Sequence, residues 1–450
     1  MITHFEVSNF KSIKHLGLDL RKFMVFVGPN GAGKTNLVRA LEVFGEVLHR
    51  GTVEPIQEHG YDQLIRREKR PARSGLYFSI RAELPALAVQ NALSILPIIM
   101  GKEKESSTSG PIHIEVGVGV TGSDQTDEVR INREELRFSS PKGALDVAFD
   151  GSRIDTNAGA DPVLWALMYS QILPYARNLK GSDFSNPENL KKVISEAFTP
   201  NTQDQVEPQL LRLINWQRMP SRPMMHIRDV SQVKRLRLDA SALRRDLSFE
   251  DSKDSTIGPT GEGLASAVAK LRGSKPEPSA RFRKVLEELQ EVYPRIEDVF
   301  ARRIPSGHLI LLFKEHGISD ELGQGSVSDG VLHALALLVA LHQEASGEAG
   351  LLVIEEPENA IHPWPLRKLI VRAQASSRQI ILTTHSETVV NAVVDPENLF
   401  LVENDNKKGT TVTPAIERES ALKAILEESG QKLGDVWLDG SLGGVPGGES

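Results

Sequence analysis

The sequence predicts an α/β protein with a strand-rich first lobe, a helical insertion and a mostly parallel second lobe. Three patterns support this prediction. A dense apolar segment at 23–27 leads into a glycine-rich turn and a helix, and short alternating segments fill the rest of the first lobe. Apolar residues at helical spacing follow between 161 and 245, and strand and helix patterns then alternate from 331 onward.

Composition and charge limit the classes of function. The 450 residues, 40% hydrophobic and 25% charged, are enough to bury a sizeable core. The absence of cysteine excludes disulfides, thiol catalysis and cysteine-ligated metals, and the histidines show no metal-ligand spacing. A net charge of -7 gives no overall attraction to nucleic acid, so such binding would need local basic patches. No apolar run suits a membrane span and no signal peptide is visible, so we expect a cytoplasmic protein without membrane contact.

The first lobe is expected to cover 1–150 and the helical insertion 151–255. Besides 2–10 and 23–27, strand patterns of the first lobe occur at 76–84, 112–120, 129–138 and 145–149. Helices of the insertion are expected at 164–168, 190–198 and 210–216.

The second lobe is expected to cover 256–415, followed by a C-terminal helix and glycine-rich tail at 416–450. Its expected helices are at 264–271, 282–292, 331–342, 365–373 and 387–393. Its expected strands are at 296–299, 309–313, 351–354, 379–382 and 399–402. This alternation favours a mostly parallel sheet.

Residues 28–35 carry the clearest functional signal. They match the phosphate-binding pattern G-x-x-x-x-G-K-[ST] and lie between a buried strand and a helix start, where that loop must lie. Backbone N–H groups and the helix dipole would favour a phosphate, Lys34 would reach the β- and γ-phosphates, and Thr35 would give an oxygen to Mg²⁺. The residues expected to bind nucleotide here are Gly28, Pro29, Asn30, Gly31, Ala32, Gly33, Lys34, Thr35 and Asn36.

Three further motifs follow in the second lobe. The apolar strand at 351–354 ends in Glu355 and Glu356, an arrangement in which one acid holds the Mg²⁺ shell and the next activates water. One helix and one strand later comes Thr-Thr-His-Ser at 383–386. Upstream, Ser-Asp-Gly at 328–330 opens an apolar helix, which makes it either a simple helix cap or an anion-binding site.

Together these residues resemble the RecF/SMC/Old-type branch of the ABC ATPases, over roughly 1–150 and 255–450. The resemblance implies an ABC/SMC-head-like P-loop NTPase fold with ATP and Mg²⁺ as cofactors. By it, 28–35 is the Walker A loop, 358–363 resembles the D-loop, and the segment Asn-Phe-Lys-Ser-Ile at 9–13 resembles an N-terminal segment common in that branch.

The resemblance also assigns roles to single residues. Lys34, Glu356 and His385 are the expected catalytic residues, with His385 as the switch histidine. Thr35 and Glu355 are the expected metal ligands, and Ser328, Asp329 and Gly330 stand at the family's signature and would bind nucleotide from the partner subunit. Two features depart from the family: a glutamate replaces the usual aspartate at Glu355, and no Q-loop glutamine is evident, with Gln57, Gln63 or the strand end at Glu134 and Glu135 as candidates.

The resemblance implies a homodimer formed head to head through ATP, and it leaves the biological role open between two hypotheses. The first is a regulatory ATPase of a prokaryotic antiviral defence module that controls a separate nuclease or toxin. Old-like ATPases commonly work with a Toprim-type nuclease, and we expect any such nuclease to be a separate polypeptide because the sequence ends soon after the expected ATPase core. The second is a RecF-like repair ATPase that clamps DNA in its ATP state.

Two basic clusters bear on the second hypothesis, at 66–73 and at 234–237 with Arg244 and Arg245. Each would either hold a phosphate backbone or form a solvated face. A transporter subunit is disfavoured by the long interval between Lys34 and Ser328, and a GTPase by the lack of an N-K-x-D motif. The sequence does not identify the trigger, the effector or the stoichiometry beyond a dimer.

Overall fold

The computed structural model describes two units whose segments alternate along the chain. The described residues are 1–67, 75–93, 110–122, 129–149, 154–158, 223–245, 256–275, 277–305, 307–343, 350–405 and 407–418, with Leu164, Leu167, Asp435 and Trp437. The first unit comprises Met1–Arg21, Thr35–Val233 and Asn404–Thr411, and the second comprises Lys22–Lys34, Lys234–Glu403 and Val412–Ser450. The phosphate-binding loop through Lys34 thus groups with the second unit, although the sequence suggested that it belongs to a lobe at 1–150.

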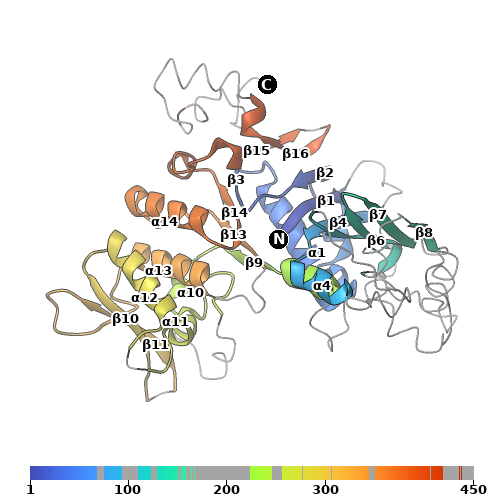
Figure 1. Cartoon of the computed structure of the whole chain (residues 1–450). Helices are drawn as coiled ribbons and strands as arrows, with labels where there is room; N and C mark the ends of the chain where they lie inside the picture. The colour runs from blue at the N-terminus through green and yellow to red at the C-terminus, as the bar shows by residue number, and fades with distance from the viewer. Residues whose placement is uncertain are drawn as a thin grey trace. The chain divides into compact units, whose positions relative to one another are not determined.

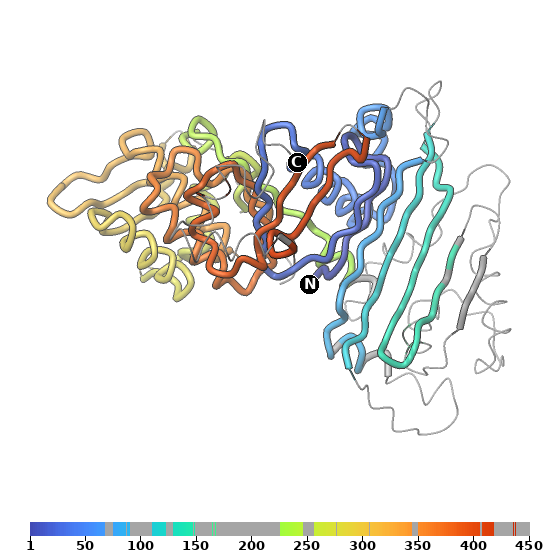
Figure 2. The backbone as a smooth tube through the Cα atoms, turned by 90° about the horizontal axis from the view of Figure 1, so that it is seen from above, coloured from blue at the N-terminus to red at the C-terminus, as the bar shows by residue number. Residues whose placement is uncertain are grey.

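An antiparallel sheet forms the first unit. Its strands run in the order β8-β7-β6-β5-β4-β1-β2 and lie side by side in Figure 2. Their bounds are β1 (Ile2–Phe10), β2 (Ile13–Asp19), β4 (Leu76–Glu83), β5 (His113–Gly122), β6 (Val129–Ser140), β7 (Gly143–Phe149) and β8 (Ile154–Ala158). The expected strands of the first lobe are therefore confirmed, and β2 is an additional strand.

Helix α1 (Lys34–Arg50) packs against this sheet from Thr35 onward. Its apolar residues recur at helical spacing, so one side of the helix buries Leu41, Phe44 and Leu48 completely. The ring of Phe44 stacks on that of Phe78 in β4, with centroids 5.2 Å apart. The remaining described helices of this unit are α2 (Glu54–Glu58), α3 (Tyr61–Leu64), α4 (Ala86–Leu93) and α9 (Pro223–Val230).

A parallel sheet forms the centre of the second unit, as the sequence predicted. Strand β3 (Phe23–Val27) lies between β14 (Gln379–Thr384) and β15 (Leu399–Asp405), and β13 (Leu351–Glu355) follows beside β14. A short edge strand, β9 (Val233–Leu236), borders β13. Strands β3, β13 and β14 are buried along their whole length, which accounts for the apolar runs at 23–27, 351–354 and 380–382.

Helix α13 (Asp329–His342) is the central helix of the second unit. Every residue from Val331 to Leu341 is buried, and the helix packs against α10, α11, α12 and α14 (Figure 1). These neighbours are α10 (Ala240–Leu243), α11 (Leu264–Arg272), α12 (Ala280–Val292) and α14 (Pro363–Ala375). A separate antiparallel sheet contains β10 (Ile296–Arg303), β11 (Leu309–Glu315) and β12 (Leu322–Gly323). The chain also forms α15 (Glu387–Val390), β16 (Gly409–Pro414) and two 3₁₀ helices, η2 (Pro396–Asn398) and η3 (Ala415–Arg418).

Several expected boundaries differ from the structure. The first-lobe sheet continues into the segment expected to be a helical insertion, because β8 pairs with β7. The strand β9 also falls in that segment, and α15 ends at Val390, before the expected end at 393. Leu164 and Leu167 are helical and buried, but the helices expected at 190–198 and 210–216 lie outside the described residues. Of the described helices, none combines the length and apolarity required to cross a bilayer.

A substitution at Gly28 tests how closely the phosphate-binding loop packs against strand β15 of the parallel sheet. A Cβ added at Gly28 would lie 2.3 Å from the carbonyl oxygen of Val402 in β15, so Gly28→Ala must displace backbone. We expect a loss of about 1–3 kcal/mol in the free energy of unfolding without nucleotide, measured by denaturant titration. The matched control is Gly323→Ala, where an added Cβ meets nothing within 4 Å, and an equal loss in both variants would contradict this account.

Candidate functional site

The phosphate-binding loop connects β3 to α1 in the way the sequence predicted. Gly31 and Gly33 adopt left-handed backbone angles, with φ of 84° and 105°, which residues other than glycine rarely adopt. The backbone N–H of Ala32 donates to the carbonyl of Pro29 at 3.2 Å and closes a tight turn. Such a curled backbone directs successive N–H groups to one side, as a phosphate cradle requires.

Lys34 lies at the end of this loop and is almost fully buried. Its Nζ donates to the carbonyl oxygens of Gly28 at 2.5 Å and Pro29 at 3.0 Å. Burial lowers the pKa of Lys34, while the charges of Glu356, Glu358 and Glu355 oppose that shift. The second unit therefore places its loop lysine within the electrostatic reach of three carboxylates.

Glu355 ends strand β13 and is one of the most deeply buried acids. Its side chain is 2% exposed, and Arg235 from β9 holds both carboxylate oxygens, with Nε at 2.6 Å from Oε1 and Nη2 at 3.3 Å from Oε2. A buried carboxylate is costly unless it is paired and hydrogen-bonded. The forked guanidinium of Arg235 meets that requirement.

Glu356 occupies an unusual backbone conformation. Its φ of 49° lies in the left-handed region, and its N–H donates to the carbonyl of Thr383 at 2.8 Å. Its Oε2 accepts from Arg237 and from Asn359, each at 3.3 Å. Left-handed backbone in a residue other than glycine is uncommon and tends to occur at functional sites, and here it turns the chain immediately after the strand.

Glu358 connects the carboxylate cluster to His385. Its Oε1 accepts from the hydroxyl of Thr384 at 2.8 Å and from the backbone N–H of His385 at 3.2 Å, and it lies 3.4 Å from His385 Nδ1. Its other oxygen, Oε2, is buried and has no hydrogen-bond partner among the described residues. The sequence placed Glu358 only at the start of a D-loop, although three acids so close after one strand were a signal of a shared site.

The predicted signature residues lie at the start of α13. Ser328 is exposed and its Oγ accepts from the N–H of Val331 at 3.4 Å, so it acts as the helix cap. The carboxylate of Asp329 pairs with Arg244 at 2.6 Å. A Cβ on Gly330 would lie 2.8 Å from the hydroxyl of Tyr293 and 3.0 Å from the carbonyl oxygen of Ala360, which explains the glycine. The structure thus supports the cap, and a further role of Ser328 toward nucleotide stays a prediction.

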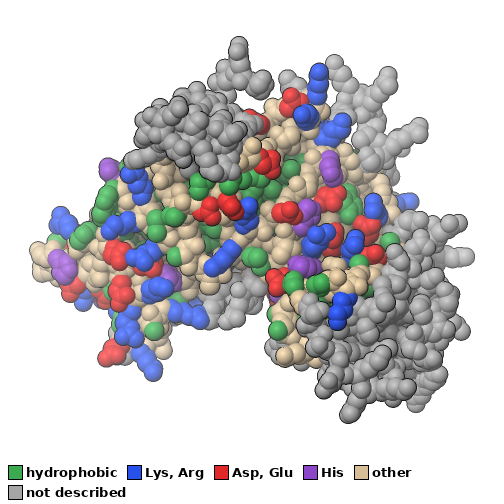
Figure 3. All heavy atoms as spheres, turned by 45° about the horizontal axis from the view of Figure 1, so that its top comes forward, with side chains coloured by type: hydrophobic (Ala, Val, Ile, Leu, Met, Phe, Trp, Pro, Cys, Tyr) green, Lys and Arg blue, Asp and Glu red, His purple; other side chains and the backbone are tan. Residues whose placement is uncertain are grey.

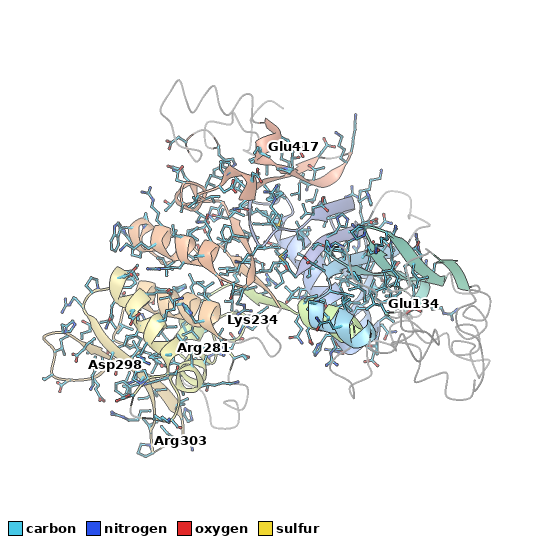
Figure 4. The ribbon with its side chains drawn as sticks, in the orientation of Figure 1. Glu134, Lys234, Arg281, Asp298, Arg303 and Glu417 are labelled. Carbon is cyan, nitrogen blue, oxygen red and sulfur yellow. The ribbon has the colours of Figure 1, made fainter. Side chains whose placement is uncertain are left out.

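The second basic cluster is not a free basic face. Arg235, Arg237 and Arg244 pair with Glu355, Glu356 and Asp329. Lys234 lies on β9 in Figure 4 and donates to Gln343 Oε1 at 3.2 Å. These pairs place three of the cations beside acids of the second unit, and DNA binding by this cluster stays a prediction. In the first cluster, 68–73 lie outside the described residues.

The residues that follow Lys34 belong to the first unit. Thr35 is exposed, and the side-chain amide of Asn36 donates to Ser12 Oγ at 2.7 Å. Ser12 Oγ also hydrogen-bonds to Thr410 Oγ1 at 2.6 Å. The N-terminal motif at 9–13 thereby positions the start of α1.

The Q-loop candidates all lie in the first unit. Gln57 and Gln63 are exposed on α2 and α3. Glu134 is fully buried in β6 (Figure 4), and Glu135 accepts from the hydroxyl of Tyr77 at 2.7 Å. The partner of Glu135 thus lies within the sheet of the first unit, and the position of a Q-loop stays open.

The side chains suit Mg²⁺ better than a metal bound by protein alone. Among the described residues no three His, Asp or Glu side chains are grouped to hold a metal ion. Mg²⁺ usually takes one or two carboxylates together with substrate phosphates and water. Glu355 offers hard oxygen ligands of that kind, on condition that Arg235 yields at least one of them.

Two family models match the chain, one in each half. Residues 1–148 match the family described as "AAA ATPase domain", and residues 226–391 match the family described as "AAA domain, putative AbiEii toxin, Type IV TA system". The first match contains the phosphate-binding loop and the second contains the carboxylates and His385. No curated protein matches the chain.

The chain also resembles solved SMC head structures at low identity. An SMC head bound to the C-terminal winged-helix domain of ScpA has 14% identity, a TM-score of 0.45, and coverage of 92% of this chain and 97% of that chain. An SMC head from Pyrococcus furiosus bound to the C-terminal domain of ScpA has 14% identity, a TM-score of 0.42, and coverage of 94% and 99%. The SMC head domain of Thermotoga maritima has 11% identity, a TM-score of 0.38, and coverage of 92% and 98%.

The family matches confirm the resemblance that the motifs predicted. Models of AAA-type ATPase domains thus match both halves of a chain with a mixed α/β fold, which supports a P-loop ATPase. ATPases of the matched AAA type generally use ATP and Mg²⁺.

Lys34 provides the most direct test of the phosphate site. We expect Lys34→Ala to weaken ATP binding at least about tenfold, because a buried cation that faces the phosphates is lost. Isothermal titration calorimetry with ATP measures the change. Lys270→Ala, which removes an exposed lysine of α11, should bind like the parent protein, and unchanged affinity in Lys34→Ala would remove the lysine from the site.

Proposed function

We propose that this chain binds and hydrolyses ATP as a head-to-head homodimer and serves as the regulatory ATPase of a prokaryotic defence module, controlling a separate nuclease or toxin effector. The observation that carries the hydrolytic part is that Lys34 and the three acids Glu355, Glu356 and Glu358 follow or end neighbouring parallel strands of one sheet, where the acids act electrostatically on the lysine. A lysine for phosphate, an acid for the metal and an acid for water are the groups that phosphoryl transfer to water requires.

Each residue has a definable task in this reaction. Lys34 leaves the carbonyls of Gly28 and Pro29 and donates to phosphate oxygens, where it offsets developing charge. Glu356 orients the attacking water and accepts its proton on a carboxylate oxygen. Glu355 and Thr35 would hold Mg²⁺, which, when bound, neutralises charge on the phosphates.

His385 is oriented by Glu358. The contact of Nδ1 with Glu358 Oε1 at 3.4 Å leaves Nε2 directed to other partners. A γ-phosphate oxygen is the partner we assign to Nε2, which makes His385 the reporter of phosphate occupancy.

The placement of Ser328 supports the dimer part of the proposal. Its side chain is exposed at the start of a 14-residue helix whose dipole favours an anion. In a head-to-head dimer this end would face the phosphates held by the partner subunit. ATP then bridges two copies, and hydrolysis releases them.

The defence role draws on two observations. One of the matched families carries a toxin and a type IV toxin–antitoxin system in its description. The basic residues 234–237 are engaged with acids and Gln343, which weakens the alternative of a RecF-like repair ATPase that clamps DNA. On the face displayed in Figure 3, basic and acidic side chains are interspersed.

Two observations separate the defence and repair functions. Tight DNA binding by the purified chain that weakens steeply with salt would favour the repair function. A gene for a small Toprim or HNH nuclease beside the coding gene would favour the defence function, and neighbouring recombination genes would contradict it.

Glu356→Gln tests the hydrolytic step. We expect kcat to fall about 10²- to 10⁴-fold, since the base is lost, while ATP affinity stays within about threefold and the ATP-bound dimer accumulates. Phosphate release and size-exclusion chromatography with ATP measure the two effects. Glu297→Gln, on β10, is the control, and parent-like turnover in Glu356→Gln would exclude Glu356 from the role.

Mixing two inactive variants tests the composite site. Ser328→Asp keeps a good helix cap but places a carboxylate against the partner's phosphates, and Lys34→Ala disables the loop. A 1:1 mixture should recover about a quarter of the parent sites, because each heterodimer contains one intact site. Ser328→Asn, which keeps a neutral cap, should retain activity.

The control mixture combines Lys34→Ala with the double variant Lys34→Ala/Ser328→Asp. It contains no intact loop, so it should remain inactive. If the first mixture is as inactive as this control, each subunit hydrolyses ATP alone and the dimer proposal fails.

A further inference from the structure

Two arginines of one short segment hold the two acids assigned to hydrolysis. Arg235 lies on β9 and Arg237 follows that strand directly, and the alternation of side chains in extended backbone sends both to the same side. They pair with Glu355 and Glu356, which are also adjacent in sequence. The backbone of Arg237 is fixed by donation of its N–H to the carbonyl of Pro259 at 2.7 Å.

The two pairs differ in strength. Arg235 and Glu355 are largely buried, with side chains 22% and 2% exposed, and they share a forked contact whose shorter distance is 2.6 Å. Arg237 and Glu356 are more exposed, at 54% and 23%, and share one contact of 3.3 Å. The Arg237 guanidinium is therefore the easier of the two to redirect.

The charges of the site are balanced in this arrangement. Lys34, Arg235 and Arg237 supply three positive charges, and Glu355, Glu356 and Glu358 supply three negative ones. Glu355 gives its oxygens to a guanidinium, so they are not available to a metal. Likewise, Glu356 Oε2 accepts from the guanidinium of Arg237 and the amide of Asn359. In hydrolysis the same carboxylate would have to bind the attacking water.

Bound Mg–ATP changes which pairing is favourable. Mg²⁺ prefers carboxylate and phosphate oxygens, and the planar fork of arginine suits a phosphate as well as a carboxylate. A divalent ion can take the place of Arg235 at Glu355. Arg237 can then pair with phosphate oxygens, because the triphosphate carries more negative charge than the carboxylate of Glu356.

We propose that Arg235 and Arg237 are further residues of the ATP site that exchange partners on nucleotide binding. Without nucleotide they neutralise Glu355 and Glu356. With Mg–ATP bound, Arg235 yields Glu355 to the metal and Arg237 moves from Glu356 to the γ-phosphate, which frees Glu356 for water. The inference rests on the proposed ATP-hydrolysing function of the same site.

The test compares ATP with ADP. Fluorescent ATP and ADP analogues are titrated into the full-length chain and into Arg237→Gln, with Arg302→Gln as control because Arg302 pairs with Glu321 on an exposed surface. We expect Arg237→Gln to lose about tenfold in affinity for ATP and little for ADP, since only ATP carries the γ-phosphate. Equal effects on both nucleotides, or none, would overturn the role of Arg237.

The role of Arg235 is tested through Mg²⁺. Arg235 competes with Mg²⁺ for Glu355. In a variant without this arginine, nucleotide binding should therefore be half-saturated at a Mg²⁺ concentration several-fold lower than in the parent chain. Arg235→Gln leaves Glu355 without its partner and can destabilise the fold, so Arg235→Lys, which keeps the charge but loses the fork, is measured beside it. A Mg²⁺ requirement that is unchanged or raised in the variants that fold would overturn this half.

Failure of the inference is separable from failure of the proposed function. If the parent chain does not bind ATP, or Lys34→Ala binds it equally well, the proposed function fails. If the parent binds ATP and depends on Lys34 while Arg237→Gln keeps the ATP to ADP preference of the parent, only the exchange fails. Arg237 and Glu356 would then be a structural ion pair, and Arg235 is judged by its Mg²⁺ test.

Discussion

The second unit depends on the electrostatic balance of charges at the ends of its parallel strands. Strands β3, β13 and β14 run in the same direction, so the loop after β3, the acids after β13 and His385 after β14 all follow carboxyl ends. These three strands are buried along their whole length, and a charge placed beside them must be paired. Lys34 and the two arginines offset Glu355, Glu356 and Glu358, and this pairing allows a polar site to be built on a buried scaffold.

The same balance explains how an acidic residue is accommodated at 328–330, the segment proposed as the signature. A carboxylate beside the triphosphate would repel it, and yet Asp329 directly follows the capping Ser328. Arg244 neutralises it at 2.6 Å and also donates to the carbonyls of Gln324 at 2.6 Å and Val327 at 2.8 Å. The aspartate is therefore held by Arg244 at the turn into α13, and the small Gly330 allows Tyr293 and Ala360 to approach.

The sequence predicted the elements that carry strong local signals. The loop at 28–35 and the buried strands β3, β13 and β14 combine fixed motif spacing with continuous apolar runs, and these places agree with the structure. Short or interrupted strands were missed: β2 contains Gly17, and β9 is only four residues long and rich in cations. Their pairing is decided by neighbouring strands distant in sequence, which local patterns do not report.

The arginines of the site show the same limit at the level of chemistry. A cluster of cations has one meaning on an open surface and another beside buried acids, and residues 234–237 are separated from Glu355 by more than a hundred positions. The sequence showed 234–237 only as a basic cluster, and it did not indicate which acids Arg235 and Arg237 meet. Their pairing keeps both acids compensated without nucleotide, whereas Glu358 has one buried oxygen for which the described part of the chain offers no hydrogen-bond partner. A buried oxygen without a hydrogen bond is unfavourable, and this one belongs to the carboxylate that contacts His385. The unpaired oxygen therefore lies next to the residue that we propose as the phosphate sensor.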